Sequence, residues 1–188
     1  MKKFIYIILI FALLYSCSSQ WCAVFQYYDY KKIIEISKPE MEMSSEGINK
    51  LIKPHEGLAL NFYIGPDGNR YIGYGHQTKT LTIITKNEAE QLLLQDIARI
   101  EKKVNKVIKI YINQYQFDAL CSFAYTFGSL PKSVAKAVNS GGDVPALIKK
   151  YNKTHKNGKL IVLRGLTKRR LAEARWYQQN EFTYNLIY

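Results

Sequence analysis

Residues 56–76 read EGLALNFYIGPDGNRYIGYGH, and they contain the clearest signals of local structure in the chain. Glu56-Gly57 marks a helix end, because glycine is the usual residue just past a helix C-terminus. Segments 60–64 and 70–74 alternate as strands do, and the PDGN sequence at 66–69 between them has the composition of a tight turn. The stretch therefore predicts a helix whose last residue is an acid, followed by a small β-hairpin.

Helical patterns surround this hairpin. Ser44 or Ser45 is predicted to cap the helix that ends near Glu56, and Pro54 should limit the regularity of that helix. After His76 the chain reads as helical throughout, with predicted helices that begin near residues 85, 113, 131, 144 and 166. A small hairpin packed on a helical body is an α+β fold.

Composition indicates a folded globular protein with one core. The chain has 188 residues, of which 47% are hydrophobic and 22% charged. Its 27 Lys and Arg against 15 Asp and Glu give a formal charge of +12, which favours polyanionic partners such as nucleic acid, anionic lipid or an acidic envelope polymer.

The first residues have the features of an export signal: a basic start at 1–3, an apolar run at 4–15 and small residues after it. The run is short for a membrane span. LYSC at 14–17 resembles the lipobox of bacterial lipoproteins, in which Cys17 would be lipidated and become the new N-terminus. An ordinary signal peptide or an uncleaved anchor remains the alternative. We therefore expect an export signal at 1–16, a tether at 17–43 and a folded domain at 44–188.

Under each of these alternatives the protein works outside the cytoplasm. With a lipid or signal anchor it is membrane-attached and faces the periplasm or the cell surface, and a nucleic-acid partner is not expected. Cys22 and Cys121 could pair in an oxidising compartment, but Cys121 lies in an apolar helical run, which favours a buried free thiol. With His55, His76 and His155 as the only histidines, the sequence does not support a metal site.

Several short motifs, taken in order, resemble the phage-type lysozymes, glycoside hydrolase family 24. The motifs are GINKLIK at 47–53, EGL at 56–58, IGYGH at 72–76, QFDAL at 116–120, SFA at 122–124, GL at 165–166, RR at 169–170 and AE at 172–173. The resemblance implies a lysozyme-like α+β fold and cleavage of the bond from N-acetylmuramic acid to N-acetylglucosamine in peptidoglycan. It implies no metal or nucleotide cofactor, and we expect a monomer.

The resemblance also implies a catalytic set: an acid on the first helix, then an aspartate and a threonine on the hairpin. By position Glu56 takes the place of the acid, but Gly65 stands in the place of the aspartate and Tyr71 in that of the threonine. Partial burial would let Glu56 keep a proton near neutral pH and give it to the leaving oxygen. Asp67, in the same turn, is the nearest substitute for the missing carboxylate; alternatively it is a solvated turn residue, because Asp before Gly is favoured for local reasons.

The hairpin also carries candidate substrate contacts. Tyr63, Tyr71 and Tyr74 are expected either to stack on sugar rings or to pack against the helix behind them. Gly75 would let the backbone approach the substrate or the helices, and His76 is expected to form a structural hydrogen bond.

The last helix offers two cations, Arg169 and Arg170. Either one of them holds Glu56 or a substrate carboxylate, or both are solvated on a helix whose Leu171, Ala174 and Trp176 face the core. Segment 152–159 reads as an exposed loop that rims the groove.

Three functions remain open. The chain is a hydrolase that uses Glu56, a lysozyme-fold module that binds peptidoglycan without cutting it, or a structural or inhibitory protein that no longer uses the substrate groove. Glu56 and the GYGH stretch at 73–76 weigh against the last, and the presence of Glu56 favours the hydrolase over the binding module.

Overall fold

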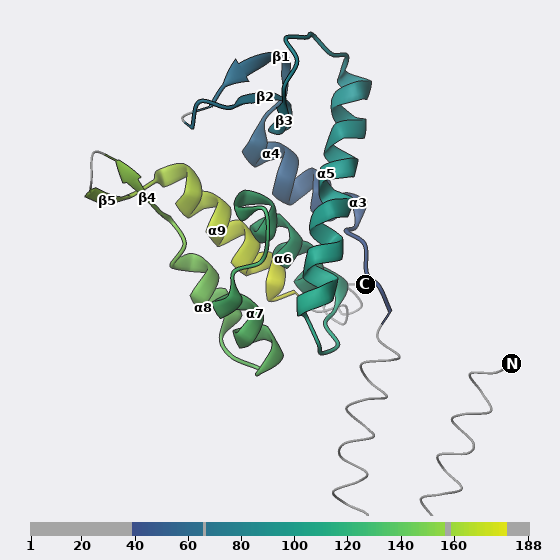
Figure 1. Cartoon of the computed structure of the whole chain (residues 1–188). Helices are drawn as coiled ribbons and strands as arrows, with labels where there is room; N and C mark the ends of the chain where they lie inside the picture. The colour runs from purple at the N-terminus through teal and green to yellow at the C-terminus, as the bar shows by residue number, and fades with distance from the viewer. Residues whose placement is uncertain (1–38, 66, 157–158, 180–188) are drawn as a thin grey trace, which may run out of the picture. The chain divides into compact units, whose positions relative to one another are not determined.

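The computed structural model describes residues 39–65, 67–156 and 159–179, with backbone alone at 155 and 156 (Figure 1). The expected signal at 1–16, the lipidation site Cys17, Cys22 and most of the tether lie outside this range. The described residues belong to one compact unit, which already packs at residues 41–43, just before the predicted domain start at 44. Within this range no helix is both long enough and apolar enough to cross a membrane.

Three short consecutive pieces form the helix that carries Glu56: α3 (Ser45–Gly47), the π-helical turn η1 (Ile48–Ile52) and α4 (Lys53–Glu56). Ser44 is the N-cap, as predicted, and its hydroxyl accepts a 2.9 Å hydrogen bond from the backbone N–H of Gly47. The irregular turn lies directly before Pro54, which has no N–H to donate within a helix. Gly57, with φ of 71°, ends the helix in a conformation that favours glycine.

The small sheet has three antiparallel strands in the order β1 (Ala59–Ile64), β2 (Arg70–Gly73) and β3 (His76–Thr78). Tyr63 pairs with Tyr71, and Tyr71 pairs with Gln77. The predicted hairpin is confirmed, but the prediction that everything after His76 is helical is wrong for β3. A tight turn between Gly73 and Gly75, both with positive φ, reverses the chain directly into this strand.

The helical body consists of α5 (Lys86–Val107), α6 (Gln114–Phe127), α7 (Lys132–Asn139), α8 (Val144–Lys149) and α9 (Arg164–Tyr177). Thr85 and Asn113 each begin a helix with a capping box, in agreement with the sequence.

A second hairpin, β4 (Lys153–Lys156) and β5 (Lys159–Val162), lies between α8 and α9. The sequence predicted a loop here. Each strand has only four residues, which is too few for a period of two to be distinguished from a polar loop.

Helix α6 lies at the centre of the body, and its residues from Phe117 to Ala124 are buried. They include Cys121, a buried free thiol as expected, whose pKa is raised by burial. A second cluster of Leu51, Ala119 and Trp176 joins η1, α6 and α9. Since α4, which ends at Glu56, follows η1 directly, this packing fixes the acid relative to the last helix.

Candidate active site

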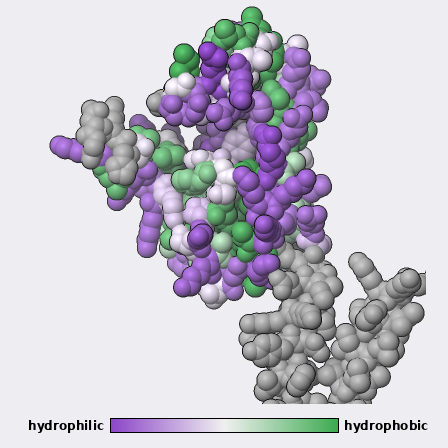
Figure 2. All heavy atoms as spheres, in the orientation of Figure 1, coloured by the Kyte–Doolittle hydropathy of each residue, from purple (hydrophilic) through white to green (hydrophobic). Residues whose placement is uncertain are grey.

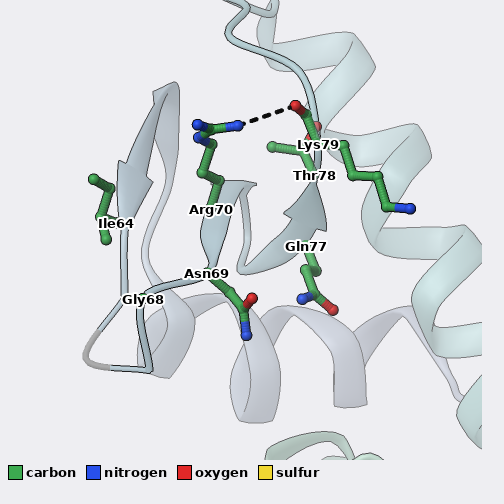
Figure 3. Close-up of a pocket in the computed structure, with 7 residues that line it drawn as sticks. All are labelled: Ile64, Gly68, Asn69, Arg70, Gln77, Thr78 and Lys79. Atoms are coloured by element: carbon green, nitrogen blue, oxygen red, sulfur yellow. Dashed lines mark hydrogen bonds between the residues drawn. The ribbon is translucent and has the colours of Figure 1, made fainter.

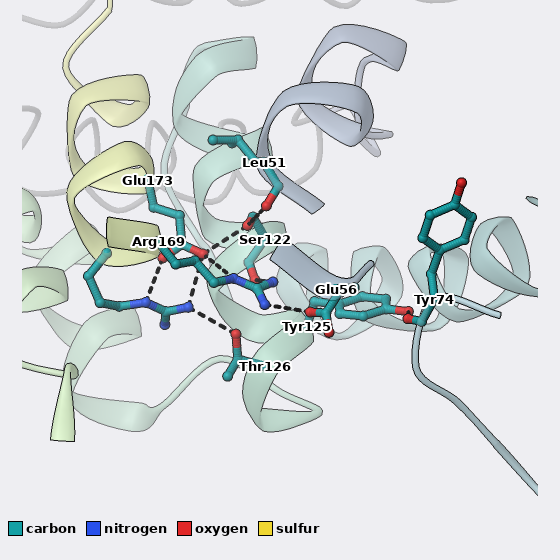
Figure 4. A network of polar contacts seen from close by, with 9 residues as sticks. Leu51, Glu56, Tyr74, Ser122, Tyr125, Thr126, Arg169 and Glu173 are labelled. Carbon is teal, nitrogen blue, oxygen red and sulfur yellow. Dashed lines mark hydrogen bonds and ion pairs between the residues drawn. The ribbon is translucent and has the colours of Figure 1, made fainter. Parts of the chain in front are cut away.

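Glu56, at the last position of α4, faces Arg169 of α9, and the two side chains form an ion pair (Figure 4). The Glu56 side chain is 21% exposed and that of Arg169 is 6% exposed. The acid is therefore partly buried, and one of the two arginines of the last helix holds it, as the first alternative predicted.

Glu173 and Ser122 hold the Arg169 side chain in place. Its Nε donates to Glu173 Oε1 at 3.1 Å, and its Nη2 donates to the carbonyl oxygen of Ser122 at 3.1 Å. The Ser122 hydroxyl in turn donates to Glu173 Oε1 at 2.8 Å. These bonds orient the guanidinium so that its remaining nitrogen points at Glu56 (Figure 4).

Arg170 and Glu173 form the buried base of this cluster. Their side chains have no exposed surface, and Arg170 Nε lies 2.9 Å from Glu173 Oε2. Burial lowers the pKa of Arg170 to about 10. Burial also raises the pKa of Glu173, against the opposing effect of Arg170 and Arg169. The alternative in which both arginines are solvated is wrong, and so is the core-facing role of Leu171, which is exposed.

Tyr125 and Gly75 lie on another side of Glu56. The Tyr125 hydroxyl donates to the carbonyl oxygen of Tyr74 at 3.0 Å, and burial, reinforced by the Glu56 carboxylate, raises the pKa of Tyr125. A Cβ placed on Gly75 would lie 3.6 Å from Glu56 Oε2, so this glycine brings the backbone close to the acid. Gly75 and Tyr125 also belong to the lining of a hollow of about 530 Å³.

His76 lines the same hollow and forms a structural contact. Its Nδ1 lies 3.0 Å from Asp96 Oδ2, and Asp96 also pairs with Arg99. This placement agrees with the structural hydrogen bond that was expected for His76.

Two of the three candidate tyrosines lie together on the sheet. Tyr63 is 42% exposed, and its ring stacks on that of Tyr71 with the centroids 5.8 Å apart. Burial, followed by the charge of the Glu56 carboxylate, raises the pKa of Tyr63. Tyr74, in contrast, is only 6% exposed and donates to Glu90 Oε1 at 3.0 Å. Of the two roles predicted for Tyr74, the geometry favours packing.

Asp67 is exposed at the turn between β1 and β2. Its carboxylate accepts hydrogen bonds from the Tyr71 hydroxyl at 2.6 Å, from Asn69 Nδ2 at 2.7 Å and from Asn69 N at 3.1 Å. The bond from Tyr71, followed by those from Asn69, lowers the pKa of Asp67. Asp67 is thus ionised at neutral pH.

A second hollow, of about 600 Å³, lies on the sheet (Figure 3) and is lined by Ile64, Gly68, Asn69, Arg70, Gln77, Thr78 and Lys79. Arg70 Nη1 donates to the carbonyl oxygen of Lys79 at 3.3 Å across it. None of the residues that line this hollow is a carboxylate.

Apolar side chains gather at the end of the molecule formed by β1 and the loop before α5 (Figure 2). The exposed members of this group include Leu60, Phe62, Ile64, Leu81 and Ile83.

Sequence reasoning missed Glu173, Ser122 and Tyr125. Glu173 carried a usable signal, because it follows Arg169 by four residues and Arg170 by three on a predicted helix. Ser122 and Tyr125 carried none, since their partners are distant in sequence. Within the described range, no three His, Cys, Asp or Glu side chains cluster in a way that could hold a metal ion.

Comparison with known proteins gives a consistent result. The sequence model of the Phage lysozyme family matches residues 53–173. The endolysin of Acyrthosiphon pisum secondary endosymbiont phage 1 is 38% identical over 141 residues, which are 71% of this chain and 95% of that protein. The endolysin of Bacillus phage PZA is 38% identical over 143 residues, which cover 71% of this chain but only 54% of that longer protein.

Solved structures of a phage endolysin and of a muramidase domain have the same fold as this chain. An endolysin from Escherichia coli O157:H7 phage FAHEc1 superposes with a TM-score of 0.68 at 32% identity, over 76% of this chain and 96% of that one. The muramidase domain of SpmX from Asticaccaulis excentricus gives a TM-score of 0.69 at 31% identity, over 74% of this chain and 99% of that one. With its α+β architecture, its helix-end acid and these relatives, the chain belongs to the phage lysozyme family.

Proposed function

We propose that this chain is an exported muramidase that hydrolyses the bond from N-acetylmuramic acid to N-acetylglucosamine in peptidoglycan, with Glu56 as the general acid. The observation that carries the proposal is the partly buried Glu56, held by Arg169 and lying next to Gly75, which lines a hollow beside the sheet. The endolysin relatives and the muramidase domain among the solved structures support the same substrate.

The reaction needs two carboxyl groups with different tasks. Glu56 gives its proton to the glycosidic oxygen, and the bond from this oxygen to the anomeric carbon breaks, with the electron pair staying on the leaving oxygen. A water molecule attacks the anomeric carbon from the opposite side and loses a proton to the second carboxylate, for which we propose Asp67. Bulk water then returns both groups to their starting states.

Arg169 positions Glu56 in this scheme. Its ion pair fixes the position of the Glu56 carboxyl, and the bonds to Glu173 and Ser122 fix the position of the guanidinium. Tyr63 and Tyr71 form a stacked ring pair, of which Tyr63 is exposed, and such a pair suits stacking on a sugar face.

Asp67→Asn tests the second carboxylate. We expect the clearing rate of purified sacculi to fall about 100-fold, because an amide cannot take the proton of the attacking water. Asp143→Asn is the matched control: Asp143 is an exposed helix N-cap, and asparagine caps equally well. If Asp67→Asn clears sacculi at the wild-type rate, Asp67 is a turn residue only.

The alternative function is binding without cleavage. It is favoured by Gly65 and Tyr71, which replace two residues of the expected catalytic set. A wild-type protein that sediments with sacculi but never clears them would establish this alternative and refute the hydrolase.

Export and anchoring rest on the sequence of the first 17 residues. We propose that Cys17 is lipidated and that the protein faces the periplasm or the cell surface. Cells labelled with a radioactive fatty acid should yield a labelled wild-type protein and an unlabelled Cys17→Ala variant. Equal labelling of both, or of neither, would refute lipidation at Cys17.

A further inference from the structure

We propose that Tyr71 is a positioning residue that holds the Asp67 carboxylate in the space above Gly65, so that Gly65, Asp67 and Tyr71 work as one unit. The catalytic consequence rests on the proposed function, whereas the positioning itself does not.

Gly65 is required for space. A Cβ placed on it would lie 2.6 Å from Cε2 of Tyr71 and 2.9 Å from Oδ1 of Asp67, both shorter than the contacts that real Cβ atoms make. Its backbone does not require glycine, since Gly65 is not among the residues with positive φ. The ring of Tyr71 and the carboxylate of Asp67 thus fill the volume that a side chain at position 65 would need.

Tyr71 supplies the bond that ties the carboxylate to the sheet. The two bonds from Asn69 are local to the turn, and a turn aspartate makes such bonds for local reasons. The 2.6 Å bond from the Tyr71 hydroxyl to Asp67 Oδ2 comes from strand β2 instead. The turn is also closed by backbone bonds from Gly65 N to Asn69 O at 2.8 Å and from Gly68 N to Gly65 O at 3.0 Å.

This unit shares one face of the sheet with Tyr63. Tyr63 and Tyr71 are register partners, so their side chains share one face, and their rings stack. Tyr63 is close enough to Glu56 for that carboxylate to help raise the pKa of Tyr63. A continuous set of contacts therefore leads from the neighbourhood of the acid through two rings to the Asp67 carboxylate. The carboxylate missing from position 65 is thereby supplied from position 67.

Tyr71→Phe tests the positioning, because it keeps the ring and the stacking and removes only the O–H donor. We expect the clearing rate to fall about tenfold, the usual scale for a lost hydrogen bond to a charged group. We also expect the pKa of Asp67, followed by carbon-13 NMR, to rise toward its ordinary value, since the Tyr71 bond is the main cause of the lowering. In an Asp67→Asn background the same substitution should change the clearing rate by less than about twofold.

The matched control is Tyr151→Phe. It removes another exposed tyrosine hydroxyl, which is bonded to Ser133 Oγ at 2.7 Å, and it should change neither the clearing rate nor the pKa of Asp67. An unchanged pKa of Asp67 in Tyr71→Phe would overturn the proposal. So would an equal loss of clearing by Tyr71→Phe with and without Asp67. The titration needs no substrate, so it tests the positioning even if the wild-type protein clears nothing.

Moving the carboxylate from position 67 to position 65 is expected to restore part of the clearing activity. Starting from Asp67→Asn, the added pair Gly65→Asp and Tyr71→Thr puts a carboxylate into the same space and removes the ring that blocks it, and threonine suits a strand. We expect this triple variant to clear sacculi at least about tenfold faster than Asp67→Asn. Gly65→Asp added alone should give no recovery, because the Tyr71 ring still occupies the volume. Equal recovery with and without Tyr71→Thr would refute the shared space.

Discussion

Replacing Glu56 by glutamine is expected to lower the clearing rate of purified sacculi about 1,000-fold. The amide has the size of the acid and can still accept a hydrogen bond from Arg169, but it has no proton to give to the leaving oxygen, and a general acid contributes about 10²- to 10⁴-fold. The initial rate of turbidity loss at equal protein concentration measures the effect.

Glu46→Gln is the matched control for this substitution. Glu46 lies in the first short helix, is exposed and forms a 3.2 Å ion pair with Lys50. The change in charge is identical, and the clearing rate should stay at the wild-type value. A Glu56→Gln variant that keeps more than about a tenth of the wild-type rate would remove Glu56 from the role of general acid.

Glu173→Gln should cost about 3 kcal/mol of unfolding free energy, the largest stability effect that we expect in the site. Glu173 is fully buried and pairs with both Arg169 and Arg170. Without its charge, two guanidiniums with little or no exposed surface lose their shared buried partner, and breaking a buried pair from one side costs about 3–5 kcal/mol. Because glutamine keeps some of the hydrogen bonds, we expect a loss at the lower end of this energy range.

Urea denaturation followed by circular dichroism measures this loss. Glu46→Gln again serves as the control and should change the unfolding free energy by less than about 0.5 kcal/mol, because its ion pair is exposed. A double variant, Glu173→Met with Arg170→Met, should recover part of the loss, since both charges of one buried pair are removed together. A Glu173→Gln protein as stable as the wild type would show that the buried cluster does not depend on this charge.

The helix starts were readable from the sequence because their causes are local. Thr85 and Glu88, and likewise Asn113 and Gln116, are three residues apart and bond reciprocally. Strands β3, β4 and β5 were missed because each is short and depends on pairing with a neighbouring strand. The alternation of apolar and polar residues within so short a segment does not reveal such pairing.

The residues of the candidate site also divide into those that local sequence predicts and those that only the tertiary structure brings together. Glu56 at a helix end and the glycine-bent hairpin were visible in the sequence, and Arg169 was named as one of two alternatives. The support behind Arg169 was not visible, because Ser122 and Glu173 are 51 residues apart and meet only in the packed structure. Gly65 and Tyr71 looked like two separate losses from a catalytic set. In the structure the ring at 71 fills the space left open at 65 and bonds to Asp67.

The chemical identity of the reducing ends that the protein releases shows directly which glycosidic bond it cuts and whether the cut depends on Glu56. Purified sacculi are digested, the new ends are reduced with borohydride, and the sugars are identified by mass spectrometry. A Glu56-dependent muramidase predicts N-acetylmuraminitol in the wild-type digest and almost none with Glu56→Gln. New ends of N-acetylglucosaminitol, or equal amounts of N-acetylmuraminitol from both proteins, would contradict it.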